Sequence, residues 1–340
     1  MKDIIKNFPP SWFACTMGTG ILANVSKMYS DNLPILANVG VFLHWLNLGV
    51  FFFLLILWIL RWILYPENAL KDLKDPVIGN FYPTIGIGML VISSSSLIIV
   101  HNLTLSWTFW IIGTILTLFF SFLIPIFTFV GEHVQISHLN PAWFIPPVGL
   151  IVIPIAGGVL LQSTTGPLFQ LLLALNLFSW GAGFFLYISL HAIMFYRFIL
   201  HKPLPSGLAP TIWINLGPVG AGTLSLLSLT KVLLPDAFKV SLLFGGILWG
   251  LGFWWLIVGL TMIIIYIAKR QFVFAMSWWA FTFPLGAYIA SSYTLAKSLS
   301  LTPLHHIGFA LYWLLLTIWV ITFLKSFHMN FIRPLRKENK

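Results

Sequence analysis

Residues 50–60 read Val-Phe-Phe-Phe-Leu-Leu-Ile-Leu-Trp-Ile-Leu, and residues 255–267 read Trp-Leu-Ile-Val-Gly-Leu-Thr-Met-Ile-Ile-Ile-Tyr-Ile. Neither run alternates between polar and apolar residues, as a membrane barrel strand would. Both runs are apolar on every face of a helix, which is typical of a helix in contact with lipid. Because only helices and closed barrels satisfy their backbone polar groups in a bilayer, these runs predict an all-α integral membrane protein.

The composition of the whole chain agrees with this prediction. Of the 340 residues, 59% are hydrophobic and 8% are charged, which is too little polar surface to cover a soluble globule. The net charge is +10, but the basic residues stand singly between apolar runs, which argues against nucleic-acid binding. At about 20 apolar residues per spanning helix, a chain of this length has room for roughly ten spans.

We therefore predict a single polytopic membrane domain over residues 1–340, in contact with the lipid bilayer. Its ten spans are expected at about 9–27, 36–64, 77–100, 106–130, 141–161, 167–196, 209–230, 240–268, 275–297 and 304–325.

The basic residues predict the orientation of these spans. With ten spans both termini lie on one side, and the other side holds only four of the 18 Lys and Arg residues: Lys27, Lys231, Lys239 and Lys297. The remaining fourteen lie on the side of the termini. Cytoplasmic loops carry the excess of Lys and Arg, so we expect both termini to be cytoplasmic and the protein to lie in the cell (plasma) membrane.

An internal repeat is visible in the odd-numbered spans. Each has an aromatic residue, then Pro or Gly, then Gly, and the closing glycines are 66, 63, 71 and 66 residues apart, which equals one helical hairpin per repeat. The five copies are Trp12…Gly18-Thr-Gly20, Phe81-Tyr-Pro83-Thr-Ile-Gly86, Trp143…Pro147-Val-Gly149, Trp213…Pro218-Val-Gly220 and Trp278…Pro284-Leu-Gly286.

Proline inside a helix removes a backbone donor and bends the helix. Irregular backbone at membrane depth is tolerated where it is buried in protein or lines a watered cavity. We therefore expect the odd helices to form an inner ring of kinked helices around a central pore, although the same residues could serve packing alone. The predicted pore-lining kinks are Gly18, Gly20, Pro83, Gly86, Pro147, Gly149, Pro218, Gly220, Pro284 and Gly286.

The polar residues of the odd spans are neutral. Candidates for the pore lining are Thr16, Asn215 and Thr282, together with the serines at 93–96. Hydroxyl and backbone donors can solvate an anion, so the composition favours anions over cations. Cys15 is the one cysteine, which excludes an internal disulfide and a Cys-based zinc site, and the histidines lack metal-ligand spacing, so no metal or cofactor is expected.

Four motifs, in this order along the chain, resemble the tellurite-resistance/dicarboxylate transporter family: Pro10-Ser-Trp-Phe-Ala-Cys-Thr-Met-Gly-Thr-Gly, Asn140-Pro-Ala-Trp-Phe-Ile-Pro-Pro-Val, Gly217-Pro-Val-Gly and Trp278-Trp-Ala-Phe-Thr-Phe-Pro-Leu. That family includes fungal malate permeases, fungal sulfite efflux pumps, bacterial tellurite-resistance proteins and plant slow-type anion channels. The resemblance implies ten helices as five hairpins in a quasi-five-fold ring, a central pore, usually a homotrimer, and transport of small anions such as malate, sulfite or tellurite-like oxyanions.

The resemblance also implies a pore gate. In the plant and bacterial relatives a phenylalanine just before the kink of the ninth helix occludes the pore, and the matching residue here is Phe283. Core packing is the alternative role for this side chain, because the chain contains 31 phenylalanines. If Phe283 is the gate, its replacement by alanine raises anion flux.

Two other functions remain as alternatives. A proton-coupled secondary carrier of organic acids could use Glu132, His133 and His138, which lie in the loop between the fourth and fifth spans. An intramembrane enzyme would need a base beside its hydroxyl groups, and the odd spans offer none. We therefore expect a transporter rather than an enzyme.

Overall fold

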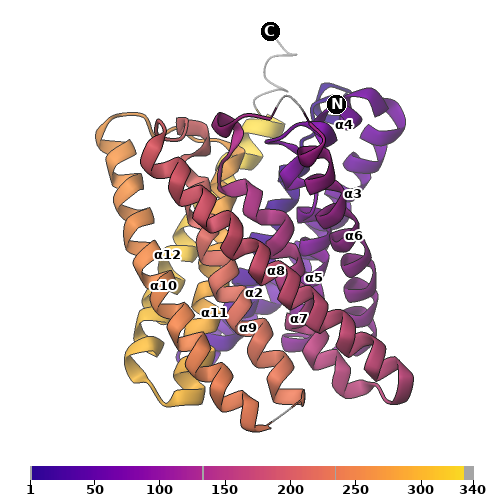
Figure 1. Ribbon diagram of the computed structural model, residues 1–340, viewed down its shortest axis with the longest axis vertical. Helices are drawn as coiled ribbons and strands as arrows, with labels where there is room; N and C mark the ends of the chain where they lie inside the picture. The colour runs from indigo at the N-terminus through magenta and orange to yellow at the C-terminus, as the bar shows by residue number, and fades with distance from the viewer. Residues whose placement is uncertain (1, 132–133, 234, 333–340) are drawn as a thin grey trace.

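The computed structural model describes residues 2–131, 134–233 and 235–332, and these residues form helices with no strand among them (Figure 1). The prediction of an all-helical protein is confirmed. Short helices α1 (Lys2–Lys6) and α4 (Pro66–Lys74) flank the long ones. The long helices are α2 (Ala14–Met28), α3 (Ile35–Leu64), α5 (Thr84–Ile98), α6 (Leu103–Phe129), α7 (Ile145–Leu160), α8 (Gly166–Leu200), α9 (Leu216–Leu233), α10 (Pro235–Ala268), α11 (Thr282–Leu299) and α12 (Thr302–Phe327).

Five of these helices begin in the same way: α2, α5, α7, α9 and α11. A 3-10 segment precedes each of them: η1 (Pro10–Phe13), η3 (Gly79–Phe81), η5 (Pro141–Phe144), η7 (Ser206–Asn215) and η8 (Met276–Phe281).

The repeated prolines lie where the α-helix begins. Pro83 is the N-cap of α5, and Pro147, Pro218 and Pro284 are each the third residue of their helix. A first-turn proline loses no helical hydrogen bond, because the first N–H groups of a helix have no partner within it. The breaks expected inside the spans are therefore junctions between 3-10 and α-helix, and the prolines that do lie inside long helices are Pro125 in α6 and Pro154 in α7.

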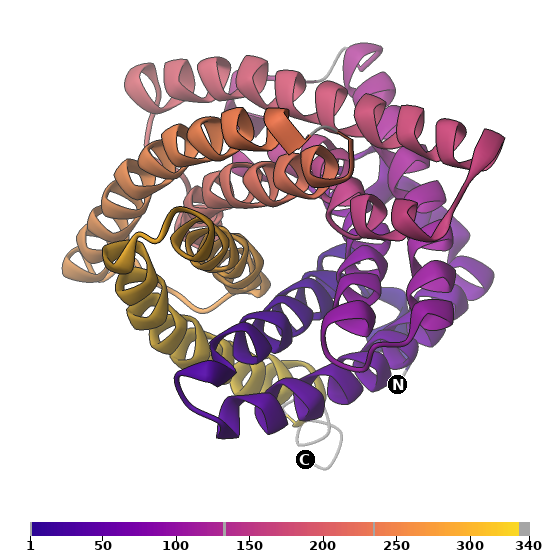
Figure 2. The same cartoon turned by 90° about the horizontal axis from the view of Figure 1, so that it is seen from below.

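The helices pack in sequential pairs around a common centre (Figure 2). α2 packs against α3, α5 against α6, α7 against α8, α9 against α10 and α11 against α12. The first helix of each pair also contacts the first helix of the next pair, and α11 returns to contact α2.

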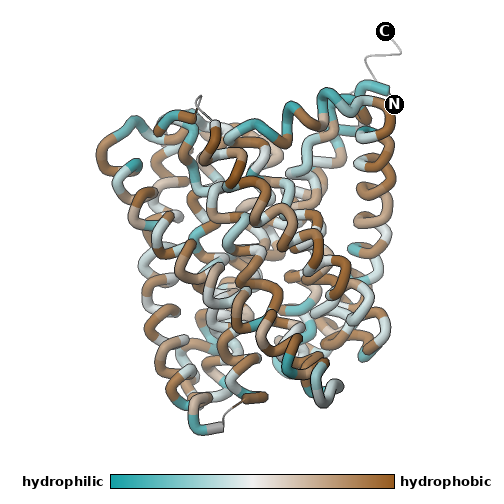
Figure 3. Tube along the Cα trace, turned by 45° about the vertical axis from the view of Figure 1, so that its right-hand side comes forward, coloured by the Kyte–Doolittle hydropathy of each residue, from teal (hydrophilic) through white to brown (hydrophobic). Residues whose placement is uncertain are grey.

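The two helices of each pair differ in how much of their surface is buried. In the most apolar windows of α5, α7 and α9 with their 3-10 segments, 83–89% of residues are buried, compared with 28–39% in α3, α6, α8, α10 and α12. These eight helices are long and apolar enough to cross a membrane, which makes the chain a multi-pass membrane protein. Apolar residues occupy the length of the helices, and hydrophilic ones gather toward the ends of the molecule (Figure 3).

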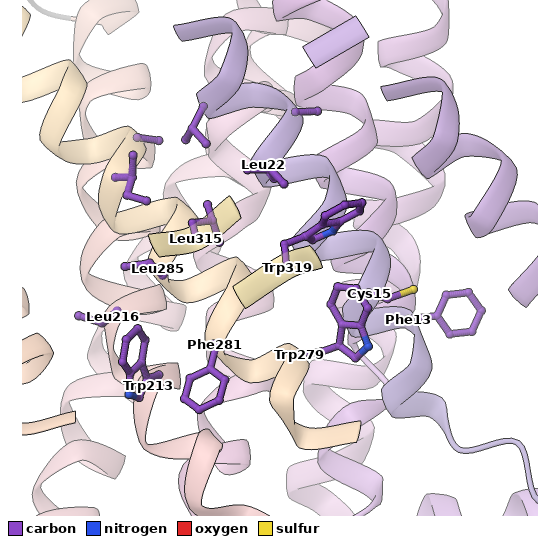
Figure 4. Close-up of a cluster of buried hydrophobic side chains, with 14 of the residues drawn as sticks. Phe13, Cys15, Leu22, Trp213, Leu216, Trp279, Phe281, Leu285, Leu315 and Trp319 are labelled. Atoms are coloured by element: carbon purple, nitrogen blue, oxygen red, sulfur yellow. The ribbon is translucent and has the colours of Figure 1, made fainter. Parts of the chain in front are cut away.

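Tryptophan side chains join the inner and outer helices. Figure 4 shows Trp319 of α12 and Trp279 of η8 within a cluster of buried apolar residues. The indole Nε1 of Trp319 donates to Thr19 Oγ1 at 3.0 Å, and that of Trp279 donates to Ser326 Oγ at 3.0 Å. Each ring thus buries a large apolar surface while its single donor is satisfied.

Two buried arginines hold the loops at the end where α1 lies. The Arg61 guanidinium donates to the carbonyl of Phe8 and forms an ion pair with Asp72 at 2.5 Å. Arg197 donates from Nε to the carbonyl of Leu139 at 3.0 Å and from Nη1 to that of Lys202 at 2.6 Å. A buried guanidinium requires such partners, because leaving it unpaired would cost several kcal/mol. Arg61 thereby holds α3 to α4 and to Phe8, and Arg197 holds α8 to Leu139 and Lys202.

Candidate functional site

A cavity of about 280 Å³ lies at the centre of the helices and reaches toward the C-terminal ends of the inner ones. We name it the distal cavity. Its walls come from α2, α5, α7, α9 and α11, with one residue from α10: Ile21, Asn24, Met28, Leu90, Val91, Ser94, Ile98, Val152, Ile155, Val159, Leu224, Leu227, Ser228, Lys231, Phe238, Phe283, Ala287, Ala290, Thr294 and Ser298.

A second, smaller cavity of about 40 Å³ lies on the side of the 3-10 segments. We name it the proximal cavity. It is lined by the same five repeats, near the points where their α-helices begin: Ala14, Met17, Phe81, Thr84, Ile145, Val148, Ile214, Gly217, Met276, Ser277, Trp279, Ala280, Phe283 and Pro284.

Phe283 is the one described residue that lines both cavities. It is the second residue of α11, and only 4% of its surface is exposed. Its apolar neighbours in the core include Met17 of α2 and Ile214 of η7. Phe283 thus contacts both cavities at the level where the 3-10 segments become α-helices.

The distal cavity carries one positive charge, and no ionisable side chain is among the described residues that line the proximal cavity. Lys231, in the last turn of α9, is the only ionisable side chain that lines either cavity among the described residues, and no carboxylate joins it there. The other polar groups of the distal cavity are the hydroxyls and amide of Asn24, Ser94, Ser228, Thr294 and Ser298. Such a lining offers hydrogen-bond donors and one cation, which suits an anion and disfavours a metal cation.

Comparison with known proteins identifies the family. The family model described as SLAC1, voltage-dependent anion channel, matches residues 7–327. The chain belongs to the SLAC1 family.

Individual relatives agree with this membership. An uncharacterized transporter of Methanocaldococcus jannaschii is 48% identical over 328 residues, which is 95% of this chain and 94% of that protein. The sulfite efflux pump SSU1 of Arthroderma otae is 26% identical over 356 residues, with 98% and 93% of the two chains covered. The malic acid transport protein of Schizosaccharomyces pombe is 22% identical over 346 residues, covering 94% and 78%. The names of the family and its relatives point to transporters and channels for small anions rather than to enzymes.

Within this SLAC1-family chain, the repeated glycines lie at helix contacts. A Cβ on Gly220 would lie 2.4 Å from the carbonyl carbon of Ala287, and one on Gly286 would lie 2.5 Å from Ile21 Cγ2. Gly18, Gly20, Gly86 and Gly149 are equally close to side chains or backbone of neighbouring helices. Of the ten residues predicted as pore-lining kinks, Pro284 alone lines one of the two cavities. The glycines thus allow the inner helices to pack closely against one another and, at Gly86 and Gly149, against α6 of the outer layer.

The three polar residues predicted for the lining bond to nearby groups instead. Thr16 donates to the carbonyl of Phe13 at 2.7 Å, and Thr282 donates to that of Trp279 at 2.8 Å. Asn215 Oδ1 lies 3.0 Å from His191 Nδ1. None of the three lines the distal or the proximal cavity. Threonine in the first turn of these helices completes the junction between 3-10 and α-helix by bonding back to it.

Sequence reasoning missed most of the polar residues that do line the distal cavity. Ser94 is part of the predicted serine run, but Asn24, Ser228, Lys231 and Thr294 were not predicted. A signal was available, because each lies four to eleven residues after the Gly or Pro of its repeat, toward the C-terminal end of an inner helix. Residues at those offsets extend the same inner face away from the junction.

The structure describes one of the three residues proposed for proton coupling. Glu132 and His133 fall outside the described residues. His138 lies in the short 3-10 segment η4 (Ile136–His138), where its Nδ1 accepts a hydrogen bond from the backbone N–H of Gln135 at 3.3 Å. His138 lines neither the distal nor the proximal cavity, and its described hydrogen bond lies within the loop.

Proposed function

We propose that this protein carries small anions across the membrane through the distal and proximal cavities, along a path that Phe283 closes. The position of Phe283 carries the proposal, since it is the one described side chain that lines both cavities. All five repeats contribute to the walls on either side of it. A single rotamer change at this ring would connect the two cavities, and rotamer changes are among the fastest motions of a protein.

We further propose that all ten long helices cross the membrane, as five hairpins in a ring. α2 and α11 are less apolar than the eight candidate spans, and most of their residues are buried. A helix shielded from lipid by its neighbours does not need an apolar surface of its own, so a modest hydropathy does not exclude a crossing. With ten crossings both termini lie on the basic side, which places them in the cytoplasm if the membrane is the plasma membrane.

The proposed substrate class is a small oxyanion or C4-dicarboxylate. The relatives include a sulfite efflux pump and a malic acid transport protein, and sulfite and malate are both compact anions rich in oxygen acceptors. Lys231 and the hydroxyls of the distal cavity supply hydrogen-bond donors for such oxygens. These donors do not require an anion with a particular number of oxygens. A homotrimer, implied by the family resemblance, is part of the proposal.

The proposal is tested by measuring anion efflux from proteoliposomes for the wild type and for Phe283→Ala. Removing the ring should raise sulfite or malate efflux by at least about tenfold, which corresponds to lowering the barrier by about 1.4 kcal/mol.

The matched control for this test is Phe281→Ala. Phe281 is also buried, at 3% exposure, and packs edge-on against Trp213, but it lines neither cavity. Its loss should leave efflux near the wild-type rate. Equal efflux from wild type and a folded Phe283→Ala variant, or an equal rise in both variants, would contradict the assignment of the gate.

A further inference from the structure

Five buried polar side chains form a cluster behind the wall of the distal cavity, where α2, α3 and α5 meet. They are Asn24, His44, Asn47, Ser94 and Ser95, and none is more than 7% exposed. His44 and Asn47 are three residues apart on one face of α3, and both are fully buried. A buried ionisable residue within a membrane segment is costly, which makes a functional role the first interpretation to consider.

The hydrogen bonds of the cluster determine which nitrogen of the His44 ring carries the proton. Ser95 Oγ lies 2.9 Å from His44 Nδ1 and also donates to the carbonyl of Ile92 at 2.9 Å. A hydroxyl has a single proton, so with that proton used on the carbonyl, Ser95 can only accept from His44. Nδ1 therefore carries the ring proton, and Nε2 presents a bare lone pair.

Several polar atoms of the cluster have no hydrogen-bond partner among the described residues. They are His44 Nε2, Asn24 Oδ1, Asn47 Oδ1 and Asn47 Nδ2. A buried polar atom without a partner is costly, so four in one cluster indicate a site that another species completes. Among these atoms, His44 Nε2 is a base and can take up a proton.

The cluster is continuous with the distal cavity. Asn24 and Ser94 line that cavity, Asn24 Nδ2 donates to Ser94 Oγ at 3.4 Å, and Ser95 is the next residue along α5. Two members of the cluster thus line the distal cavity, and the His44 ring is bonded to the residue that follows one of them.

Few charged groups face His44 from the elements around it. Trp45 packs edge-on against the ring, and α5 and α6 carry no ionisable side chain. On α2 the nearest is Lys27, beside Gly40, one turn of α3 away from His44. Other ionisable groups at this end contact other residues or solvent: Asp31 and Lys297 pair with each other, His305 packs on Tyr29, and His101 and His306 are exposed.

We propose that His44 Nε2 is a proton-binding site beside the anion path, and that a proton there and an anion in the distal cavity bind together. This inference rests on the proposed function. When the proton binds, an Nε2–H bond forms and an O–H bond of a hydronium ion in the cavity breaks, with no transfer of electrons to or from an oxidant. The resulting imidazolium attracts an anion strongly, because the surroundings are poorly solvated.

Such coupling is reciprocal, so the anion also favours proton binding. Anion flux should therefore rise as the pH on the distal side falls. Couplings between two sites are typically about 5-fold to 150-fold, so we expect the efflux at pH 5.5 to exceed that at pH 7.5 by at least about fivefold.

The test is the pH dependence of anion flux in proteoliposomes for the wild type, His44→Gln and the control His306→Gln. Glutamine keeps hydrogen-bonding groups but cannot take up a proton. We expect His44→Gln to reduce the ratio of the two fluxes to about one, whereas His306→Gln, at an exposed position on the same end of the molecule, should keep the wild-type ratio. A pH-independent wild type, or a ratio unchanged in His44→Gln, would overturn the proton site. Absence of anion flux from the wild type and from Phe283→Ala would instead contradict the proposed function.

A measurement on the wild type does not depend on whether the His44 variant folds. Nitrogen-15 NMR of labelled histidine, with Ser95→Ala used to assign the His44 signals, should find the Nδ1–H tautomer at high pH. Saturating sulfite should shift the titration of that ring to higher pH. The opposite tautomer, or a titration that sulfite does not move, would contradict the proposal.

Discussion

At the scale of single residues, charge and bulk are divided between two positions of the proposed path. Phe283 contributes an apolar ring that lines both cavities, and Lys231, at the far end of α9, contributes the one positive charge among the described lining residues. The Lys231 side chain is exposed, so water weakens its field. We infer that it concentrates anions in the distal cavity without holding them tightly, as a conducting path requires.

Replacing Lys231 by glutamine should therefore weaken anion binding modestly. Two unit charges about 4 Å apart in water interact by about 1 kcal/mol, so the half-saturating concentration of sulfite should rise by about fivefold. The rise should shrink in high salt. Lys239→Gln is the control, because Lys239 is exposed on α10 and does not line the cavity. A flux curve that Lys231→Gln leaves unchanged would show that this charge takes no part in the path.

Residue roles were the hardest feature to predict from sequence. The composition indicated a neutral lining, and the family resemblance indicated Phe283. Thr16, Asn215 and Thr282 were chosen because they are polar and lie near the breaks, but the two threonines bond back to their own segments and Asn215 Oδ1 lies beside His191. A sequence does not reveal whether a threonine hydroxyl bonds back to its own helix or points into a cavity, since both are common in membrane helices.

At the scale of elements, the sequence predicted the number and order of the long helices well. Each of the ten predicted spans overlaps one long helix, with ends that differ by up to seven residues, and eight of these helices are long and apolar enough to cross a membrane. The repeated proline was located correctly but interpreted as a kink within a helix. Periodicity does not separate a 3-10 turn from an α-helical one over three or four residues, so the expected kink and the observed junction look alike in sequence.

The glycines of the repeat predict a stability effect. A Cβ on Gly220 would meet the backbone of Ala287 and Tyr288 at 2.4–2.6 Å, so Gly220→Ala must push α9 away from α11. We expect a loss of about 1–3 kcal/mol in stability, measured as a lower melting temperature in detergent.

The control for this prediction is Gly246→Ala. Gly246 lies on α10 with nothing within 4 Å of its would-be Cβ. There alanine should be neutral or slightly stabilising, because it favours the helix. A Gly220→Ala protein as stable as the wild type would show that the contact between α9 and α11 can widen at no cost.

At the scale of the whole molecule, each inner helix packs on its two inner neighbours, and the outer helices cover them. In the SLAC1 family member described here, this arrangement puts the polar and charged lining of the distal cavity at the centre and leaves lipid-compatible surface outside (Figure 3). The central claim is that anions cross through this centre, rather than between helices at the periphery.

The most direct test of that claim is block of anion flux by a negatively charged thiol reagent in the Phe283→Ala background. With Ser94→Cys, which places the thiol on the wall of the distal cavity, modification should abolish most of the flux by filling the path with bulk and negative charge. Thr104→Cys, exposed on the outer side of α6, should keep its flux after the same treatment. Flux that persists while mass spectrometry shows the Ser94→Cys thiol fully modified would contradict a central path.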